Sequence, residues 1–179
     1  MATINGTEGN DNLIGTVDND GISGFGGNDF IAGDSGDDTL LGGAGNDTIY
    51  GDGGNDWVSG GAGNDSVSGS GGQDDIVFHE FGTANADTVS NFATAWDMLR
   101  FDGSAFSGLG GAGEFAAGDG RFYAAAGASG AHDGDDRLIY NTSTGQLYYD
   151  ADGQGGADAQ LVATLPSGTT LAASDLWVI

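Results

Sequence analysis

The 179-residue sequence contains no cysteine and no lysine, and only three arginines oppose its 27 acidic residues. The absence of cysteine excludes a disulfide framework, a thiol nucleophile and any cysteine-ligated zinc or iron site. A net charge of −24 with so few cations argues against binding to nucleic acid or to an anionic membrane surface, because both depend on Lys and Arg. The natural counterions of such a chain are hard cations, and calcium is the first candidate.

Long apolar segments and catalytic motifs are also missing. No apolar run approaches the roughly 18 residues that a membrane span needs, and residues 1–6 lack the basic and apolar regions of a secretory signal peptide. His79-Glu80 begins the zinc-protease motif H-E-x-x-H, but Thr83 stands at the second histidine position, and His132 is the only other histidine. Because no nucleophile elbow or phosphate-binding loop is present either, we expect no enzyme activity and ordinary structural or surface roles for both histidines.

What the sequence does contain is a repeat. From Gly6 to Val77 it divides without a gap into eight nine-residue blocks, in which position 1 is always Gly, position 6 is always Asp and position 8 is always Leu, Ile or Val. Position 4 is Gly in seven blocks, and Asp18 is the exception. Such self-similarity at a fixed period predicts a stacked repeat architecture. A disordered Gly/Asp-rich linker is the alternative, but a linker has no reason to keep an aliphatic residue two positions after every Asp.

Each half of the block predicts a different local structure. The G-x-x-G-x-D half is turn material, since Gly adopts positive φ at little cost and Asn or Asp tolerates it. The x-U-x half (U, aliphatic) predicts a short strand with one side chain pointing inward. Two blocks then form an 18-residue coil, and four coils stack about 4.8 Å apart as a parallel β-roll over residues 1–77 of an all-β protein. The predicted inner faces are Leu13, Ile31, Ile49 and Val67 on one side, and Ile22, Leu40, Val58 and Ile76 on the other.

The same geometry stacks the position-6 aspartates in two columns. Neighbouring carboxylates about 4.8 Å apart repel each other, and a Ca²⁺ ion between adjacent turns removes that repulsion when backbone carbonyls complete its oxygen ligands. Four turns per column leave three gaps, so we expect about six ions. The predicted metal ligands are Asp11, Asp29, Asp47 and Asp65 in one column, and Asp20, Asp38, Asp56 and Asp74 in the other.

The blocks resemble the G-G-x-G-x-D-x-U-x repeat of the RTX (repeats-in-toxin, hemolysin-type) calcium-binding proteins. GGAGNDTIY at 42–50 and GGAGNDSVS at 60–68 fit every defined position, whereas the first two blocks depart at positions 2 and 4. The resemblance implies a β-roll that is unfolded without calcium and folds when calcium is supplied. It also implies that turn carbonyls join the aspartates as ligands, such as those of Gly27, Gly36, Gly45, Gly54, Gly63 and Gly72.

Residues 78–179 have a different composition and contain all three arginines. Strand-like segments predict a β-rich cap for the open end of the roll, with a hairpin loop at 141–145 and weak structure over 103–131. The predicted strands cover 87–92, 98–101, 137–140, 147–149, 160–165 and 176–179.

Parts of this region, including the ending Asp175-Leu-Trp-Val-Ile179, resemble the tail of proteins exported by type I secretion. That resemblance implies an uncleaved C-terminal signal, the type I secretion machinery as a partner and an extracellular location. Residues 150–158 offer a possible further Ca²⁺ site, but Gln154 breaks the EF-hand pattern and favours a plain acidic turn.

Three roles for the folded molecule remain open at this point. It can be the export and folding module of a larger secreted enzyme, or a stand-alone extracellular adhesin or surface protein. A polysaccharide-binding role is the third, with calcium or the aromatic residues Phe25, Phe30, Tyr50 and Trp57 contacting sugar.

Overall fold

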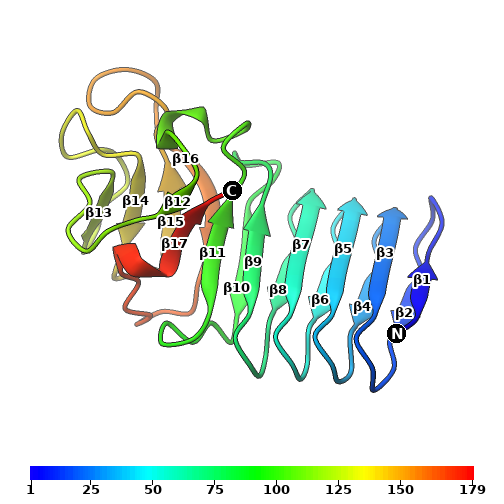
Figure 1. Ribbon diagram of the computed structural model, residues 1–179. Coiled ribbons are helices and arrows are strands. Elements are labelled where there is room, and N and C mark those ends of the chain that lie inside the picture. Colours follow the sequence, from blue (N-terminus) through cyan, green and yellow to red (C-terminus); the bar gives the residue numbers. More distant parts are fainter.

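The computed structural model describes residues 1–179 and consists almost entirely of short strands in two sheets that face each other (Figure 1). No helix is long and apolar enough to cross a bilayer, and the two helical segments are single 3-10 turns, η1 (Ser107–Leu109) and η2 (Ala173–Asp175). The first sheet has, in spatial order, β1 (Thr3–Asn5), β3 (Gly21–Gly26), β5 (Thr39–Ala44), β7 (Trp57–Ala62), β9 (Asp75–Phe78), β11 (Met98–Phe101), β17 (Leu176–Val178) and β12 (Gly113–Glu114). The second sheet has, in spatial order, β13 (Phe122–Ala125), β14 (Leu138–Asn141), β15 (Gln146–Tyr149), β16 (Gln160–Thr164), β10 (Asp87–Ser90), β8 (Ser66–Ser68), β6 (Thr48–Tyr50), β4 (Phe30–Ala32) and β2 (Asn12–Ile14).

The strands of the repeat pair in parallel with a constant offset of 18 residues. Ile22 is in register with Leu40, and Leu40 with Val58. The chain therefore winds as a solenoid in which each coil contributes one strand to each sheet, which confirms the parallel β-roll that the nonapeptide spacing predicts. All eight predicted inner residues are buried, and seven of them have an exposed fraction of 2% or less (Ile22, Ile31, Leu40, Ile49, Val58, Val67 and Ile76).

The parallel ladder runs on beyond the last nonapeptide, into the segment that the sequence analysis assigns to the cap. β8 pairs with β10 and β9 pairs with β11, so that Val67 is in register with Val89 and Ile76 with Leu99. These offsets are 22 and 23 residues, because longer turns replace the six-residue turns of the repeat. Val89 and Leu99 are buried and extend the two inner rows by one coil.

The C-terminal residues close the end of the roll, in agreement with the predicted β-rich cap. β16 adds in parallel to β10, and β14, β15 and β16 then continue as antiparallel neighbours. The predicted loop at 141–145 joins β14 to β15. The last strand, β17, lies in parallel against β11, and Leu176 and Val178 are buried there (Figure 1).

The cap has an aromatic core that the sequence analysis only partly anticipates. Phe101, Phe106 and Tyr149 pack together with ring centroids 5.0–5.3 Å apart. Residues 103–131 were expected to have weak structure, but Phe106, Leu109 and Phe115 from this stretch are completely buried. Their isolated positions among Gly, Ala and Ser give no periodic signal, so the sequence does not reveal that they fill the cap.

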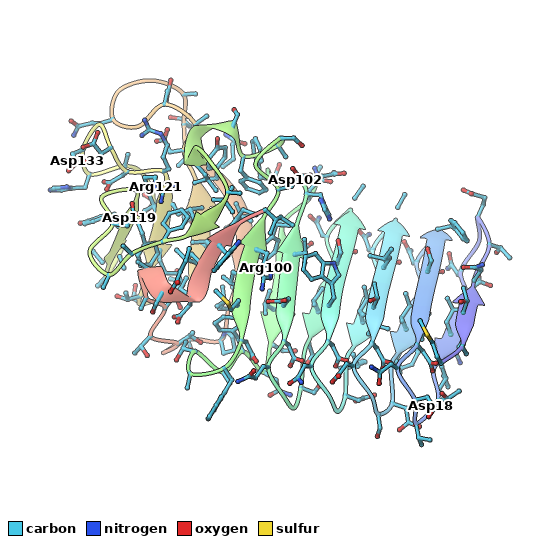
Figure 2. The ribbon with its side chains drawn as sticks, in the orientation of Figure 1. Asp18, Arg100, Asp102, Asp119, Arg121 and Asp133 are labelled. Atoms are coloured by element: carbon cyan, nitrogen blue, oxygen red, sulfur yellow. The ribbon has the colours of Figure 1, made fainter.

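Arg100 on β11 neutralises one carboxylate on the outer surface of the first sheet (Figure 2). Its Nε lies 2.6 Å from Asp75 Oδ1, and its guanidinium lies between the rings of Trp57 and Trp177, 5.6 Å and 5.4 Å from their centroids. Such cation–π contacts hold the planar group in place. No arginine precedes residue 100, and Asp75 is the one repeat carboxylate that an arginine pairs with.

Candidate metal centre

The position-6 aspartates stack in two columns, as the 18-residue spacing predicts. In each column, one carboxylate oxygen accepts a hydrogen bond from the backbone amide of the aspartate one coil earlier. The Asp11 amide donates to Asp29 Oδ1 and the Asp29 amide to Asp47 Oδ1, both at 2.8 Å. In the other column the Asp20 amide donates to Asp38 Oδ1 at 2.6 Å. The amides of Asp38 and Asp56 donate in the same way to the Oδ1 atoms of Asp56 and Asp74. The Oδ1 atoms therefore hold successive turns together.

Two further aspartates extend these columns beyond the repeat. The Asp65 amide donates to Asp87 Oδ1 at 3.0 Å, and the Asp74 amide donates to Asp97 Oδ1 at 3.1 Å. The sequence analysis did not name either residue because the nonapeptide spacing has ended. A signal was nevertheless present: each is followed, two positions later, by an aliphatic residue, as every position-6 aspartate is.

The second oxygen of the carboxylate distinguishes the later blocks from the first two. In six consecutive blocks Oδ2 is buried and has no hydrogen-bond partner. A buried carboxylate oxygen without a partner is strongly unfavourable, and native structures supply such groups with a donor or a cation. These six atoms belong to Asp29, Asp38, Asp47, Asp56, Asp65 and Asp74.

Position-1 glycine leaves space beside this oxygen. A Cβ atom at Gly24 would come closer than 3.0 Å to both Asp29 Oδ2 and the carbonyl oxygen of Gly42, which belongs to the next coil. The same relation holds at Gly33, Gly42 and Gly51 with Asp38, Asp47 and Asp56 respectively. The absence of a side chain thus leaves, between a carboxylate and a carbonyl oxygen, a small space that a Cβ atom would fill, and at Gly60 and Gly69 a Cβ atom would likewise clash with the aspartate carboxylate. The position-1 carbonyl is a possible ligand that sequence reasoning did not single out.

The position-4 glycines take a left-handed conformation that no other residue type adopts at so little cost. Their φ angles are between 98° and 147° in the six blocks from Gly27 to Gly72. The carbonyl oxygens of Gly27, Gly36, Gly45 and Gly54 accept no backbone hydrogen bond and lie against the position-4 glycine of the next coil. The turn carbonyls that the resemblance implies as ligands therefore have free lone pairs.

Without a cation, burial makes the charged form of these carboxylates unfavourable. Burial raises the pKa of Asp56 to about 7 and that of Asp65 to about 6, and the neighbouring carboxylates in each column add to the increase. The pKa of Asp87 rises to about 8 for the same reasons. A divalent ion beside such a group would favour the charged form instead.

Position 5 has a structural role that the sequence analysis described only as turn propensity. The side-chain oxygen of Asn28 accepts a hydrogen bond from the Asn46 amide at 2.8 Å, and that of Asn46 accepts one from the Asn64 amide at 2.9 Å. In the other column, Asp37 accepts from the Asn55 amide at 2.8 Å. This ladder runs in the opposite direction to that of the aspartates, so each turn is bonded to both of its neighbours.

Two acidic turns outside the repeat, around Asp150 and Asp136, have hydrogen-bond donors within the protein. Asp150 Oδ1 accepts from the amides of Asp152 and Gly153, as in an ordinary acidic turn. Asp136 Oδ2 likewise accepts from the amides of His132 and Asp133 in the cap, close to the labelled Asp133 in Figure 2. In both turns one carboxylate oxygen is satisfied by backbone amides of the same turn.

The donor set of the columns matches a hard cation. Carboxylate and carbonyl oxygens, with neither nitrogen nor sulfur among them, are the ligands that Ca²⁺ takes, six or more at a time. The six blocks from Asp29 to Asp74 supply an unpartnered oxygen and the adjacent space. The structure thus defines a parallel β-solenoid with stacked, oxygen-lined turns.

Comparison with known proteins identifies the repeat. Residues 5–40 and residues 41–76 each match the family model of the RTX calcium-binding nonapeptide repeat, and this model comprises four copies of the nonapeptide. No curated protein matches the chain in sequence. Residues 5–76 are therefore RTX-type calcium-binding nonapeptide repeats.

Solved structures with a similar course of the chain include two repeat modules of a mannuronan C5-epimerase from Azotobacter vinelandii. The AlgE6R2 subunit is 22% identical, with a TM-score of 0.48 over 97% of this chain and 90% of that one. The AlgE6R3 subunit is 23% identical, with a TM-score of 0.45 over 96% and 79%. The extracellular lipase LipA from Serratia marcescens is 15% identical, with a TM-score of 0.35, and this chain spans 39% of its length.

Proposed function

We propose that this chain is a calcium-triggered folding module of a secreted protein, unfolded at low calcium and folded on binding several Ca²⁺ ions outside the cell. The observation that carries the proposal is the row of six buried Asp Oδ2 atoms without a partner. In the absence of an ion these groups oppose folding, so the free energy of ion binding becomes free energy of folding. The proposal assigns no catalytic step to this chain.

The location of the C-terminal tail fits export before folding. Leu176 and Val178 of β17 are buried between β11 and β12, so any factor that reads the tail must do so while the chain is unfolded. At cytosolic, sub-micromolar calcium, sites with dissociation constants of about 10⁻⁴–10⁻³ M stay empty. Millimolar calcium outside the cell would fill them.

Calcium titration of the purified chain tests the folding proposal. In EDTA we expect a coil-like far-UV circular dichroism spectrum, which changes to a β spectrum with a midpoint near millimolar Ca²⁺. Mg²⁺ is the matched control and should not produce the change, because it demands a tighter octahedral geometry and loses its water reluctantly. A β spectrum that is already complete in EDTA would contradict the proposal, since the roll would then be stable through its own packing.

The export proposal is tested separately in a host with a type I secretion system. Removing residues 175–179 should leave the protein inside the cell, measured as the ratio of medium to cell-bound protein. A matched control replaces the surface residue Trp96, 61% exposed, with Ala and should be exported normally. Undiminished export of the truncated chain would refute the C-terminal signal while leaving calcium-triggered folding untouched.

A further inference from the structure

The first two turns of the roll differ from the six that follow in how the position-6 carboxylate is completed. Asp11 Oδ2 accepts hydrogen bonds from the Thr7 amide at 2.6 Å and the Thr7 hydroxyl at 2.8 Å. Asp20 Oδ2 accepts the equivalent pair from Thr16 at 2.7 Å and 2.8 Å. In the six later turns the corresponding oxygen has no partner. Two donors from the protein thus occupy the atom that the later turns leave free.

The backbone of these turns differs as well. In the later six blocks the position-2 residue has positive φ, between 68° and 111°, and position 4 is also left-handed. In the first two blocks neither position has positive φ. Thr is β-branched and is strongly disfavoured in the left-handed region. It therefore keeps the turn in a second conformation, in which the position-2 amide and hydroxyl point at the carboxylate.

We propose that the Thr7 and Thr16 turns close on these hydrogen bonds and take no calcium, and that the ions occupy the six turns from Asp29 to Asp74. This inference rests on the proposed calcium-binding function. The sequence analysis placed six ions in the gaps between position-6 aspartates, beginning at Asp11 and Asp20. With the ions in the later turns the expected number stays at six, each ion lies one coil nearer the cap, and Asp87 and Asp97 flank the last of them.

The electrostatics of the column that begins at Asp20 agree with this division. Hydrogen bonds from the Ala2 amide and the Thr16 hydroxyl hold the pKa of Asp20 below its usual value. Burial raises the pKa of Asp38, which is the next member of the same column. Fixed donors thus stabilise the charge on the threonine-closed carboxylate, whereas the following carboxylate lacks such donors on its second oxygen.

Counting bound Ca²⁺ by equilibrium dialysis of the folded full-length chain tests this assignment. Thr7→Gly gives the first block the full G-G-x-G-x-D motif and should add one ion relative to wild type. Thr16→Gly with Asp18→Gly does the same for the second block and should add another. Thr7→Val is the matched control: it removes the hydroxyl but keeps the β-branch, so the turn stays closed and the count should stay unchanged.

A reciprocal change tests the same idea at the other end of the roll. Ser70 is the position-2 residue of the last block, with a φ of 76°, and Ser70→Thr adds a single methyl group. It should remove one ion, whereas Ser70→Ala should remove none. Equal counts for wild type, Thr7→Gly and Ser70→Thr would overturn the threonine assignment. A wild-type chain that binds no calcium would overturn the proposed function itself, so the two failures are distinguishable.

Discussion

Replacing Asp47 and Asp65 with Asn raises the calcium midpoint of folding by at least about tenfold. Asn preserves the Oδ1 acceptor for the amide of the preceding turn, but it removes the negative charge from the unpartnered second oxygen. Calcium affinity depends strongly on the number of charged ligands, and a loss of about 1.4 kcal/mol corresponds to a factor of ten. The far-UV circular dichroism titration measures the midpoint directly.

Asp52→Asn is the matched control for this experiment, because it changes the net charge per substitution equally at an exposed turn position. Its midpoint should stay within about twofold of wild type, since screening weakens the effect of a surface charge. If the control and the Asp47/Asp65 variant shift equally, the bulk charge of the chain sets the calcium response, and the columns do not. The calcium-free spectrum of the Asp52→Asn variant should be that of wild type.

Lowering the pH from 7.5 to about 5 in EDTA increases the β-structure of the chain. The folded-state pKa of Asp56 is about 7 and that of Asp65 about 6, above the ordinary value of 3.8 that applies in the unfolded chain. Between these limits the folded protein binds more protons than the unfolded one, so the stability of the calcium-free roll falls as the pH rises. Their contribution is complete below about pH 4 and is lost as the pH rises through 6 to 7.

Calcium reverses this dependence, because protons and Ca²⁺ compete for the same carboxylates. The calcium midpoint should therefore increase as the pH falls from 7.5 to 5.

The variant Asp87→Asn tests the cost of burying a carboxylate. Burial disfavours the charged form of Asp87 and raises its pKa to about 8, whereas Asn is neutral at every pH. Asp87→Asn should therefore stabilise the calcium-free roll at pH 7.5. Circular dichroism in EDTA at both pH values measures these effects, with light scattering to exclude precipitation near the pI. A loss of β-structure on acidification would contradict the assignment.

The structure of the repeat could be predicted closely because the nine-residue period specifies both the buried side chains and the neighbours of each aspartate. The aliphatic residue at position 8 fixes which side chains point inward, and the 18-residue coil then fixes which aspartates are neighbours. Leu40 and Val58 are in register and buried for the first reason, and the Asp29 amide meets Asp47 Oδ1 for the second. Regular repetition converts local propensity into long-range contacts without further assumptions.

What the sequence could not show depends on irregular turns and on conformation. Asp87 and Asp97 join the columns only because loops of different length bring them back into register, and their offsets cannot be read from a fixed period. The turns at Thr7 and Thr16 have a different backbone conformation from the six later turns of the same length, and the repeat pattern does not specify which conformation a turn takes. The burial of Phe106 and Phe115 depends on tertiary packing in the cap, which leaves no periodic trace in a Gly- and Ala-rich stretch.

The two oxygens of each aspartate carry a consequence for how the protein senses calcium. One oxygen accepts the amide of the preceding coil, and the other faces the space next to the position-1 glycine. An ion that fixes one carboxylate therefore also orders the backbone of its neighbour, which lowers the entropic cost of filling the adjacent turn. Occupancy should spread along a column as a front, with few half-filled molecules. The roll would then respond to a threshold concentration of calcium, in the manner of a one-dimensional lattice with strong nearest-neighbour coupling.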